Sequence, residues 1–300
     1  MNRLWPCGLA IHPMRTLRLL SFAFLIVAIL GGCSLLRTGY EQADHLSLWW
    51  IDRQLNLNSA QSHWLKSELK ALHDWHRETQ LPGYAVLLET FSRRSLGDVS
   101  VGQVCTDIDS TIEKLDALLI QTVPLWAQLA RQLSTSQLAY LRQRFDAEDR
   151  RWREEWLDIS TDKLLSKRQK EWAERAETFY GRLSDLQKTF IRDAVRRSSW
   201  DPQLSWERRL LRQQQALAVL EKIIREKPAQ ATAEDEIRKL IVRSLRPEDA
   251  RMAEMQRKLI DEACANLSSL HQLTSPEQRL RARDKLASYE RDFRLLAERR

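Results

Sequence analysis

Two histidines, His73 and His76, are the residues whose type and spacing come closest to metal chemistry. Three positions apart in a helix, both imidazoles would point to the same side and could touch one ion. Zinc generally takes at least three protein ligands, and neither an acidic residue nor a cysteine completes this pair. We therefore expect no metal ion, and we interpret His76 as a core histidine that hydrogen-bonds a carbonyl or a carboxylate.

Recognisable catalytic motifs are missing from the sequence. It has no glycine-rich phosphate loop, no G-x-S-x-G and no H-E-x-x-H. Paired acids such as Glu154–Glu155 and Asp235–Glu236 stand among Lys and Arg, which is typical of solvated helical faces. The sequence therefore predicts a protein that is not an enzyme and has no cofactor. The alternative is a hydrolase that uses His76 and nearby acids.

The first residues of the chain read as a targeting signal. Residues 19–30 are apolar or small and carry no charge, and Arg15 and Arg18 precede them. This stretch is shorter than the roughly 20 residues of a membrane-spanning helix. It ends in Leu30-Gly31-Gly32-Cys33, which resembles the lipobox of bacterial lipoproteins. The resemblance implies cleavage before Cys33 and acyl chains on that residue, with Met14 as an alternative start of the signal.

This signal divides the chain into three parts. We expect a lipoprotein signal peptide at 1–32, a lipidated cysteine with a short tether at 33–39, and an all-helical periplasmic domain at 40–300. More than one acyl chain gives stable anchoring. By the sorting rule of the lipoprotein class, Ser34 after the cysteine indicates the outer membrane facing the periplasm. Loss of three arginines lowers the net charge from +7 to +4, so we expect no nucleic-acid partner.

Two further cysteines, Cys105 and Cys264, remain in the predicted mature chain. The periplasm is oxidising, so they can form a disulfide. Two buried free thiols are the alternative, because sequence spacing does not show whether the side chains are close.

Helical periodicity dominates from about Glu41 onward. Apolar residues recur at spacings of three and four, as in Leu65, Leu69 and Leu72, and no segment sustains a period of two. With 43% hydrophobic residues the chain can build a core, while 8 Gly and 8 Pro are few for the turns of an all-β fold. We predict an all-α fold, a multi-helix bundle or stacked helical array of about nine or ten helices.

Five capping boxes mark the predicted helix starts. In each, a short polar side chain accepts from an N–H of the first turn, and a Gln three positions later reaches back to the cap. The boxes are Asn58/Gln61, Ser100/Gln103, Ser134/Gln137, Ser184/Gln187 and Ser275/Gln278. Leucine precedes three of them, and Leu-Ser/Thr-x-x-Gln is similar to the LTxxQ motif of Spy-like periplasmic chaperones. That resemblance implies a helical cradle, whereas capping alone explains the same residues.

A second resemblance is densest in residues 40–91, which are similar to an uncharacterised family of Gram-negative lipoproteins. It rests on Trp49-Trp50, Asp52, the box at 57–61 and a motif of unknown role. The motif consists of Trp75, His76, Arg77, Leu81, Pro82 and Tyr84. The resemblance implies an envelope address and a helical fold, and no established activity. We expect this segment to end a helix, because the residue before proline avoids the helical region.

Tryptophan is abundant, with 11 residues, all but Trp5 beyond the signal. Most stand at helical spacing and are predicted to lie in the core, while a few could line an exposed groove. We expect Trp49 and Trp50 to seal the first helix onto the bundle. The alternative is that they rest at the membrane–water interface, which tryptophan favours.

Taken as a set, these features predict a membrane-anchored envelope lipoprotein that acts by binding. Acyl chains on Cys33 hold it to the membrane, and its helical surface meets an envelope protein or a cell-wall structure. A Spy-like holdase is the sharper version of this prediction. The alternative from another class is a hydrolase of envelope polymers with a site around His76.

The lipid anchor is directly testable. Cys33→Ser should leave an unacylated precursor that keeps its apolar segment, because only the thiol can take the diacylglyceryl thioether. Metabolic labelling with a radioactive fatty acid measures this. Label that persists in the Cys33→Ser protein contradicts the predicted anchor.

Overall fold

The computed structural model describes residues 34–298, and all regular structure in that range is helical, as predicted. In chain order the elements are α2 (Ser34–Glu41), α3 (Ala43–Leu55), α4 (Ser59–Trp75), the π-helix η1 (His76–Gln80), α5 (Leu81–Arg94), α6 (Val101–Gln121), α7 (Val123–Gln132), α8 (Thr135–Trp156), α9 (Thr161–Tyr180), α10 (Asp185–Arg197), α11 (Pro202–Glu226), α12 (Gln230–Leu245), α13 (Ala250–Gln272) and α14 (Pro276–Glu298). At most one residue separates α2 from α3, the members of α4–η1–α5, or α6 from α7. With each of these series counted as one rod, the described chain has ten rods.

The capping boxes form at the predicted positions. Helices α4, α6, α8, α10 and α14 begin directly after the cap residue of a box. In the first four, the short side chain accepts from the backbone N–H of the Gln, and the Gln side chain accepts from the cap N–H. Ser275 and Gln278 make the same two bonds, at 3.2 and 3.1 Å. The local sequence therefore fixes where these helices start.

Four of the capping glutamines also bind one another in pairs. Gln61 and Gln137 exchange amide hydrogen bonds of 3.2 and 2.7 Å, and both side chains are buried. Each amide also donates to a backbone carbonyl beside its partner, Gln61 to Gln132 and Gln137 to Asn56. We call this reciprocal pair the first glutamine clasp. It holds the start of α4 against the start of α8.

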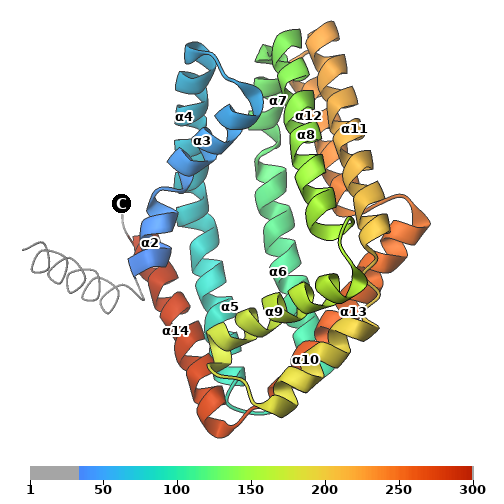
Figure 1. The fold of residues 1–300 in the computed structure, drawn as a ribbon. Coiled ribbons are helices and arrows are strands. Elements are labelled where there is room, and N and C mark those ends of the chain that lie inside the picture. Colours follow the sequence, from blue (N-terminus) through green and yellow to red (C-terminus); the bar gives the residue numbers. More distant parts are fainter. Residues whose placement is uncertain (1–33, 299–300) are drawn as a thin grey trace, which may run out of the picture.

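The second glutamine clasp repeats this arrangement elsewhere. Gln187 and Gln278 exchange amide hydrogen bonds of 2.7 and 3.1 Å, and they donate to the carbonyls of Leu273 and Arg182. This pair joins the starts of α10 and α14. Figure 1 shows α4 and α8 beginning near the top of the view and α10 and α14 near the bottom. The two clasps therefore lie toward opposite ends of the molecule.

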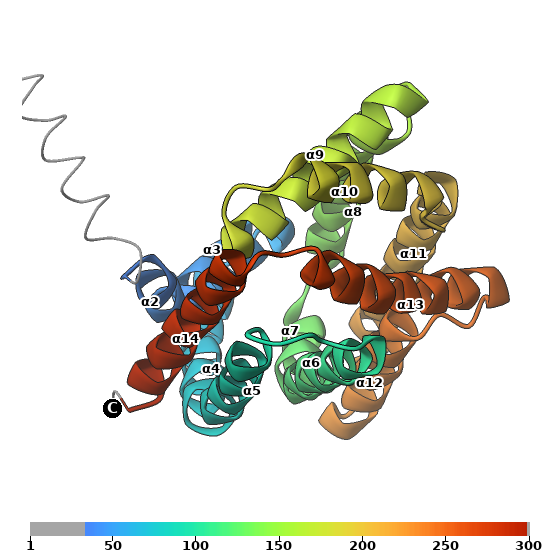
Figure 2. The same ribbon diagram turned by 90° about the horizontal axis from the view of Figure 1, so that it is seen from below.

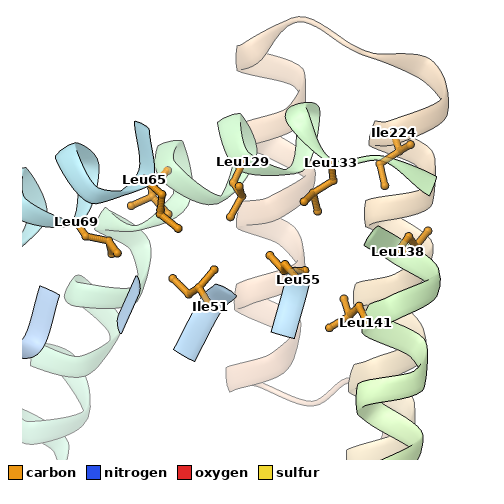
Figure 3. Close-up of a cluster of buried hydrophobic side chains, with 10 residues drawn as sticks. Ile51, Leu55, Leu65, Leu69, Leu129, Leu133, Leu138, Leu141 and Ile224 are labelled. Carbon is orange, nitrogen blue, oxygen red and sulfur yellow. The ribbon is translucent and has the colours of Figure 1, made fainter. Parts of the chain in front are cut away.

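The apolar core consists of separate clusters. The largest gathers leucine and isoleucine side chains from α3, α4, α7, α8 and α11, which point toward one another in Figure 3. A second cluster lies where α7 meets α11 and α12, around Val123, Ile223 and Ile237. A third joins α9, α10 and α13 around Leu183, Ile191 and Leu270. Viewed from below, the helices follow one another around the middle of the molecule (Figure 2).

A disulfide and a group of hydrogen bonds join α6 to α13. Cys105 and Cys264 are bonded, with their Cα atoms 5.1 Å apart, across 159 positions of sequence. Ser268 and His271 on α13 bind the carbonyls of Val99 and Gly97, which lead into α6. The disulfide confines a long loop of the unfolded chain, which for such a loop is worth up to about 5 kcal/mol.

The segment predicted as a tether is largely helical. Residues 34–41 form α2, which packs on α14, where Arg37 pairs with the buried Asp292 at 3.3 Å. Residues 36–39 of the expected tether therefore belong to the folded body. The predicted signal at 1–32 and Cys33 lie outside the described residues. Within the described part of the chain, no helix combines the length and apolar character needed to cross a bilayer.

The clasps can be tested with two equivalent capping glutamines. Gln61 and Gln103 each bond back to their own cap, but Gln61 is buried in a clasp and Gln103 is exposed. We expect Gln61→Ala to lower the free energy of unfolding by about 1–3 kcal/mol more than Gln103→Ala, because it also removes two buried bonds to the amide of Gln137 and one to the carbonyl of Gln132. Urea unfolding measures both. Equal losses in the two variants would show that the clasp adds nothing to the cap.

Candidate functional site

The motif between Trp75 and Tyr84 is where the chain departs from the prediction. We expected Leu81-Pro82 to end a helix, but α4 continues through η1 into α5. The N–H of Leu81 bonds the carbonyl of His76, five residues earlier, which is the π-helical pattern. A proline ring clashes with the carbonyl four residues before it in an α-helix. The wider π turn relieves this constraint, and the helix survives its proline.

The π-helix gathers aromatic rings around His76. The hydroxyl of Tyr40, at the end of α2, lies 2.9 Å from His76 Nδ1. The ring centroid of Tyr84 lies 5.3 Å from that of His76, and Phe293 of α14 lies 6.1 Å from Tyr84. His76 thus bonds a phenol, not the carbonyl or carboxylate that we expected. The motif residues join three helices, with Leu81 fully buried and Pro82 exposed.

Burial governs the titration of this cluster. It lowers the pKa of His76, and the neighbouring His73 lowers it further. The pKa of His73 is also lowered, first by burial and then by Arg77, and its Nε2 is buried without a hydrogen-bond partner. Burial raises the pKa of Tyr40 to about 12. Both imidazoles are therefore kept neutral, which suits packing. Among the described residues no group of three or more potential ligands could hold a metal ion.

A large cavity lies elsewhere, between the three apolar clusters. Its volume is about 1390 Å³, and residues of α3 and of α7 through α13 line it. We call it the tryptophan cleft, because six tryptophans line it together with five arginines. These are Trp50, Trp126, Trp152, Trp156, Trp172 and Trp200, with Arg168, Arg175, Arg208, Arg209 and Arg212. Three glutamates, Glu148, Glu171 and Glu262, are its acidic members.

The tryptophans of the cleft pack in pairs and under cations. Trp152 of α8 stacks on Trp206 of α11 with ring centroids 5.4 Å apart, and Trp156 meets Trp200 edge to face at 5.7 Å. Arg168 of α9 lies over Trp200, its guanidinium carbon 4.6 Å from the ring centre. Such offset, edge-on and cation–π contacts hold large rings in place without burying them.

The prediction that most tryptophans lie in the core is wrong. None of those in residues 34–298 is fully buried, and six line the tryptophan cleft. Trp49 and Trp50 are 56% and 54% exposed, so they do not seal α3 onto the bundle. Their neighbours on the helix, Ile51 and Leu55, do that instead. The expectation that a few tryptophans line a groove describes the structure better.

Charges around the cleft are partly paired. Arg209 bonds Asp149 at 2.6 Å, and Gln213 bonds the same carboxylate oxygen at 2.9 Å. Glu148 accepts from Gln54 of α3, so these bonds join α3, α8 and α11. Arg168 bonds the hydroxyl of Ser198, and burial lowers its pKa. The cleft therefore offers aromatic faces next to guanidinium groups, and those of Arg168 and Arg209 are held by hydrogen bonds.

Sequence reasoning singled out none of the arginines of the cleft. The available signal was the repetition of Trp at 152 and 156 and of Arg at 208 and 212, each one helical turn apart. The sequence-predicted motif at 75–84 forms a separate cluster, and none of its residues lines the cleft.

Comparison with known proteins gives one match. A family model described as a family of unknown function (DUF6279) matches residues 53–251, about two thirds of the chain. No curated protein and no solved structure matches it. The cleft's lining falls mostly within the matched residues, and the segment 75–84 lies there as well.

The histidine cluster makes stability depend on pH. Because folding lowers the pKa of His73 and His76 below the ordinary value of 6.5, the unfolded chain binds more protons as the pH falls. Stability should therefore drop on acidification from about pH 7.5 to pH 5.5. Urea unfolding across this range measures it. In the double variant His73→Gln, His76→Gln, the loss of stability on acidification should shrink to the contribution of His271, whose pKa is also lowered. An unchanged pH dependence in that variant would contradict the assignment.

Proposed function

We propose that this chain, which belongs to the DUF6279 family of unknown function, is a non-enzymatic binding protein that holds a polypeptide segment of an envelope protein in the tryptophan cleft. The observation that carries the proposal is the lining, where six tryptophans and five arginines face one cavity. Trp and Arg are the residue types that most often dominate binding energy at protein interfaces. These large side chains come from several helices and meet in one cavity.

The size of the cleft favours a macromolecular segment. Sites for small molecules generally measure about 300–1,000 Å³. At about 1390 Å³ the tryptophan cleft is larger, and helices α3 and α7 to α13 contribute to it. A peptide segment can contact many of these helices at once.

The polar residues of the lining favour a peptide over a lipid chain. The lining also includes the polar residues Ser198, Ser205, Gln213, Ser244 and Asn266. A peptide backbone needs partners for its N–H and C=O groups. The amide of Asn266 can supply both kinds, and the side-chain oxygens of Ser205, Gln213 and Ser244, whose described bonds use only their donors, can accept from its N–H groups. An acyl chain would instead remove water from charged and polar groups without replacing their hydrogen bonds.

The envelope address remains part of the proposal. It rests on the lipobox at Leu30–Cys33, which lies outside the described residues, and includes attachment to the outer membrane through acyl chains. Because α2 starts at Ser34, an anchor at Cys33 would place the folded body next to the membrane surface. A Spy-like holdase is the version of this function in which the bound segments are those of unfolded clients.

A hydrolase around His76 has no supporting observation. The described hydrogen bond of His76 goes to Tyr40, whereas a catalytic histidine base is normally oriented by a carboxylate. His76 also lies away from the cleft. We therefore retain binding as the function that the geometry supports best.

Two adjacent tryptophans provide the test. Trp50 lines the cleft and Trp49 does not, yet their exposure is nearly equal. With a fluorophore-labelled, permanently unfolded polypeptide as the probe, Trp50→Ala should weaken binding by about 30-fold, the effect of losing an interface anchor. Trp49→Ala should change it by less than about twofold. Fluorescence anisotropy measures both affinities.

Stability serves as the control, because neither variant removes a buried side chain and both should unfold near the wild-type urea midpoint. No binding by the wild-type protein, or equal effects of the two variants, would contradict the proposal. Suppression of client aggregation at stoichiometric ratios would support the holdase version. Binding without suppression would leave a scaffold or assembly role.

A further inference from the structure

Two arginines on α11 are available to an incoming ligand. Arg208 and Arg212 lie one helical turn apart, so their side chains leave the same face of the helix. Both line the tryptophan cleft, and both also line a second cavity of about 350 Å³ that extends toward the start of α13. The two arginines are therefore shared by the linings of both cavities.

Neither guanidinium pairs with a carboxylate among the described residues. The described bond of Arg208 goes to the backbone carbonyl of Ser244, at 3.1 Å. Burial lowers the pKa of Arg208, and repulsion from Arg212 lowers it further. Two cations held together without an anion raise the energy of the empty site, and an anion would relieve it.

The two acids that line the second cavity, Glu248 and Asp249, are already engaged, and so is Glu207, which precedes Arg208 in the sequence. Glu248 pairs with Arg243 at 3.2 Å, and Glu207 with Arg251 at 3.3 Å. Asp249 caps α13, where it accepts from the N–H groups of Arg251 and Met252. The protein's own carboxylates thus leave the charges of Arg208 and Arg212 to a ligand.

We propose that Arg208 and Arg212 form an anion-binding subsite that holds a carboxylate side chain of the polypeptide bound in the tryptophan cleft. This inference rests on the proposed function and adds a specificity, namely for segments in which acidic residues alternate with aromatic ones. Guanidinium groups bind carboxylates with paired hydrogen bonds, and tryptophan faces receive aromatic side chains. Over the whole lining, with this pair included, five arginines stand against three glutamates, so the pair accounts for the positive excess of the cleft.

Calorimetric titration with two short peptides tests the subsite. One peptide alternates Glu with Phe, and the other has Gln in place of every Glu. At low ionic strength the wild-type protein should bind the acidic peptide about tenfold more tightly, and added salt should shrink the difference. The double variant Arg208→Gln, Arg212→Gln should bind the two peptides within about twofold of each other, with its affinity for the Gln peptide unchanged.

Two further variants serve as controls. Arg196→Gln, Arg197→Gln removes the same charge from exposed positions at the end of α10, outside both cavities, and should keep the preference. The single variant Arg212→Gln changes an exposed side chain, so it should fold normally and still lose most of the preference.

Each contrary result has a distinct meaning. Equal binding of both peptides by the wild-type protein overturns the subsite and leaves the peptide-binding function intact. A preference that survives in the double variant, or falls equally in the Arg196, Arg197 control, overturns it as well. No binding of either peptide overturns the proposed function together with the subsite. Displacement of the acidic peptide by anionic phospholipid vesicles, dependent on Arg208 and Arg212, would assign the pair to a lipid headgroup and overturn the proposal.

Discussion

The reciprocal hydrogen bonds between glutamine side chains are the constraint on which the arrangement of the helices depends. A capping box works with either Glu or Gln at its last position. Only Gln can also exchange bonds with a second copy of itself, since a carboxylate has no N–H to donate. Each clasp glutamine closes its own cap, exchanges bonds with the amide of its partner and donates to a backbone carbonyl beside that partner. The four are Gln61, Gln137, Gln187 and Gln278. A local signal for a helix start thereby becomes a joint between two helices far apart in sequence.

The tryptophan cleft follows from how these joints divide the core. One clasp lies beside the largest apolar cluster and the other beside the third, where α9, α10 and α13 pack. Residues at the edges of all three clusters, including Trp126, Ile241 and Trp172, also line the cleft. Large side chains that a single continuous core would have buried are left facing one shared space. Their partial exposure is the expected result of a core divided into separate clusters and not built around one apolar centre.

The sequence predicted the features that depend on local capping, and it did not predict those that depend on contacts between distant helices. Helix starts were predicted near residues 59, 101, 135, 185 and 276, and helices begin at all five positions, because a cap and its partner are three positions apart and need no tertiary contact. The tryptophans were misplaced, because helical spacing shows which side chains share a face but not whether another helix covers that face. The helix-stopping role assigned to Pro82 failed for a different reason. The π turn that accommodates the proline sets His76 and Tyr84 against α2 and α14, and such tertiary contacts cannot be read from the local sequence.

The close packing of α14 along α5 has a consequence for how the protein is made. Ser92 of α5 donates to the carbonyl of Arg283, and Arg294 pairs with Glu89 at 2.9 Å, so contacts span about 200 positions of chain. Contacts between distant segments make folding slow, since a long loop must close before they form. Helix α5 emerges early in synthesis and must wait, with its apolar face uncovered, until residues 276–298 arrive.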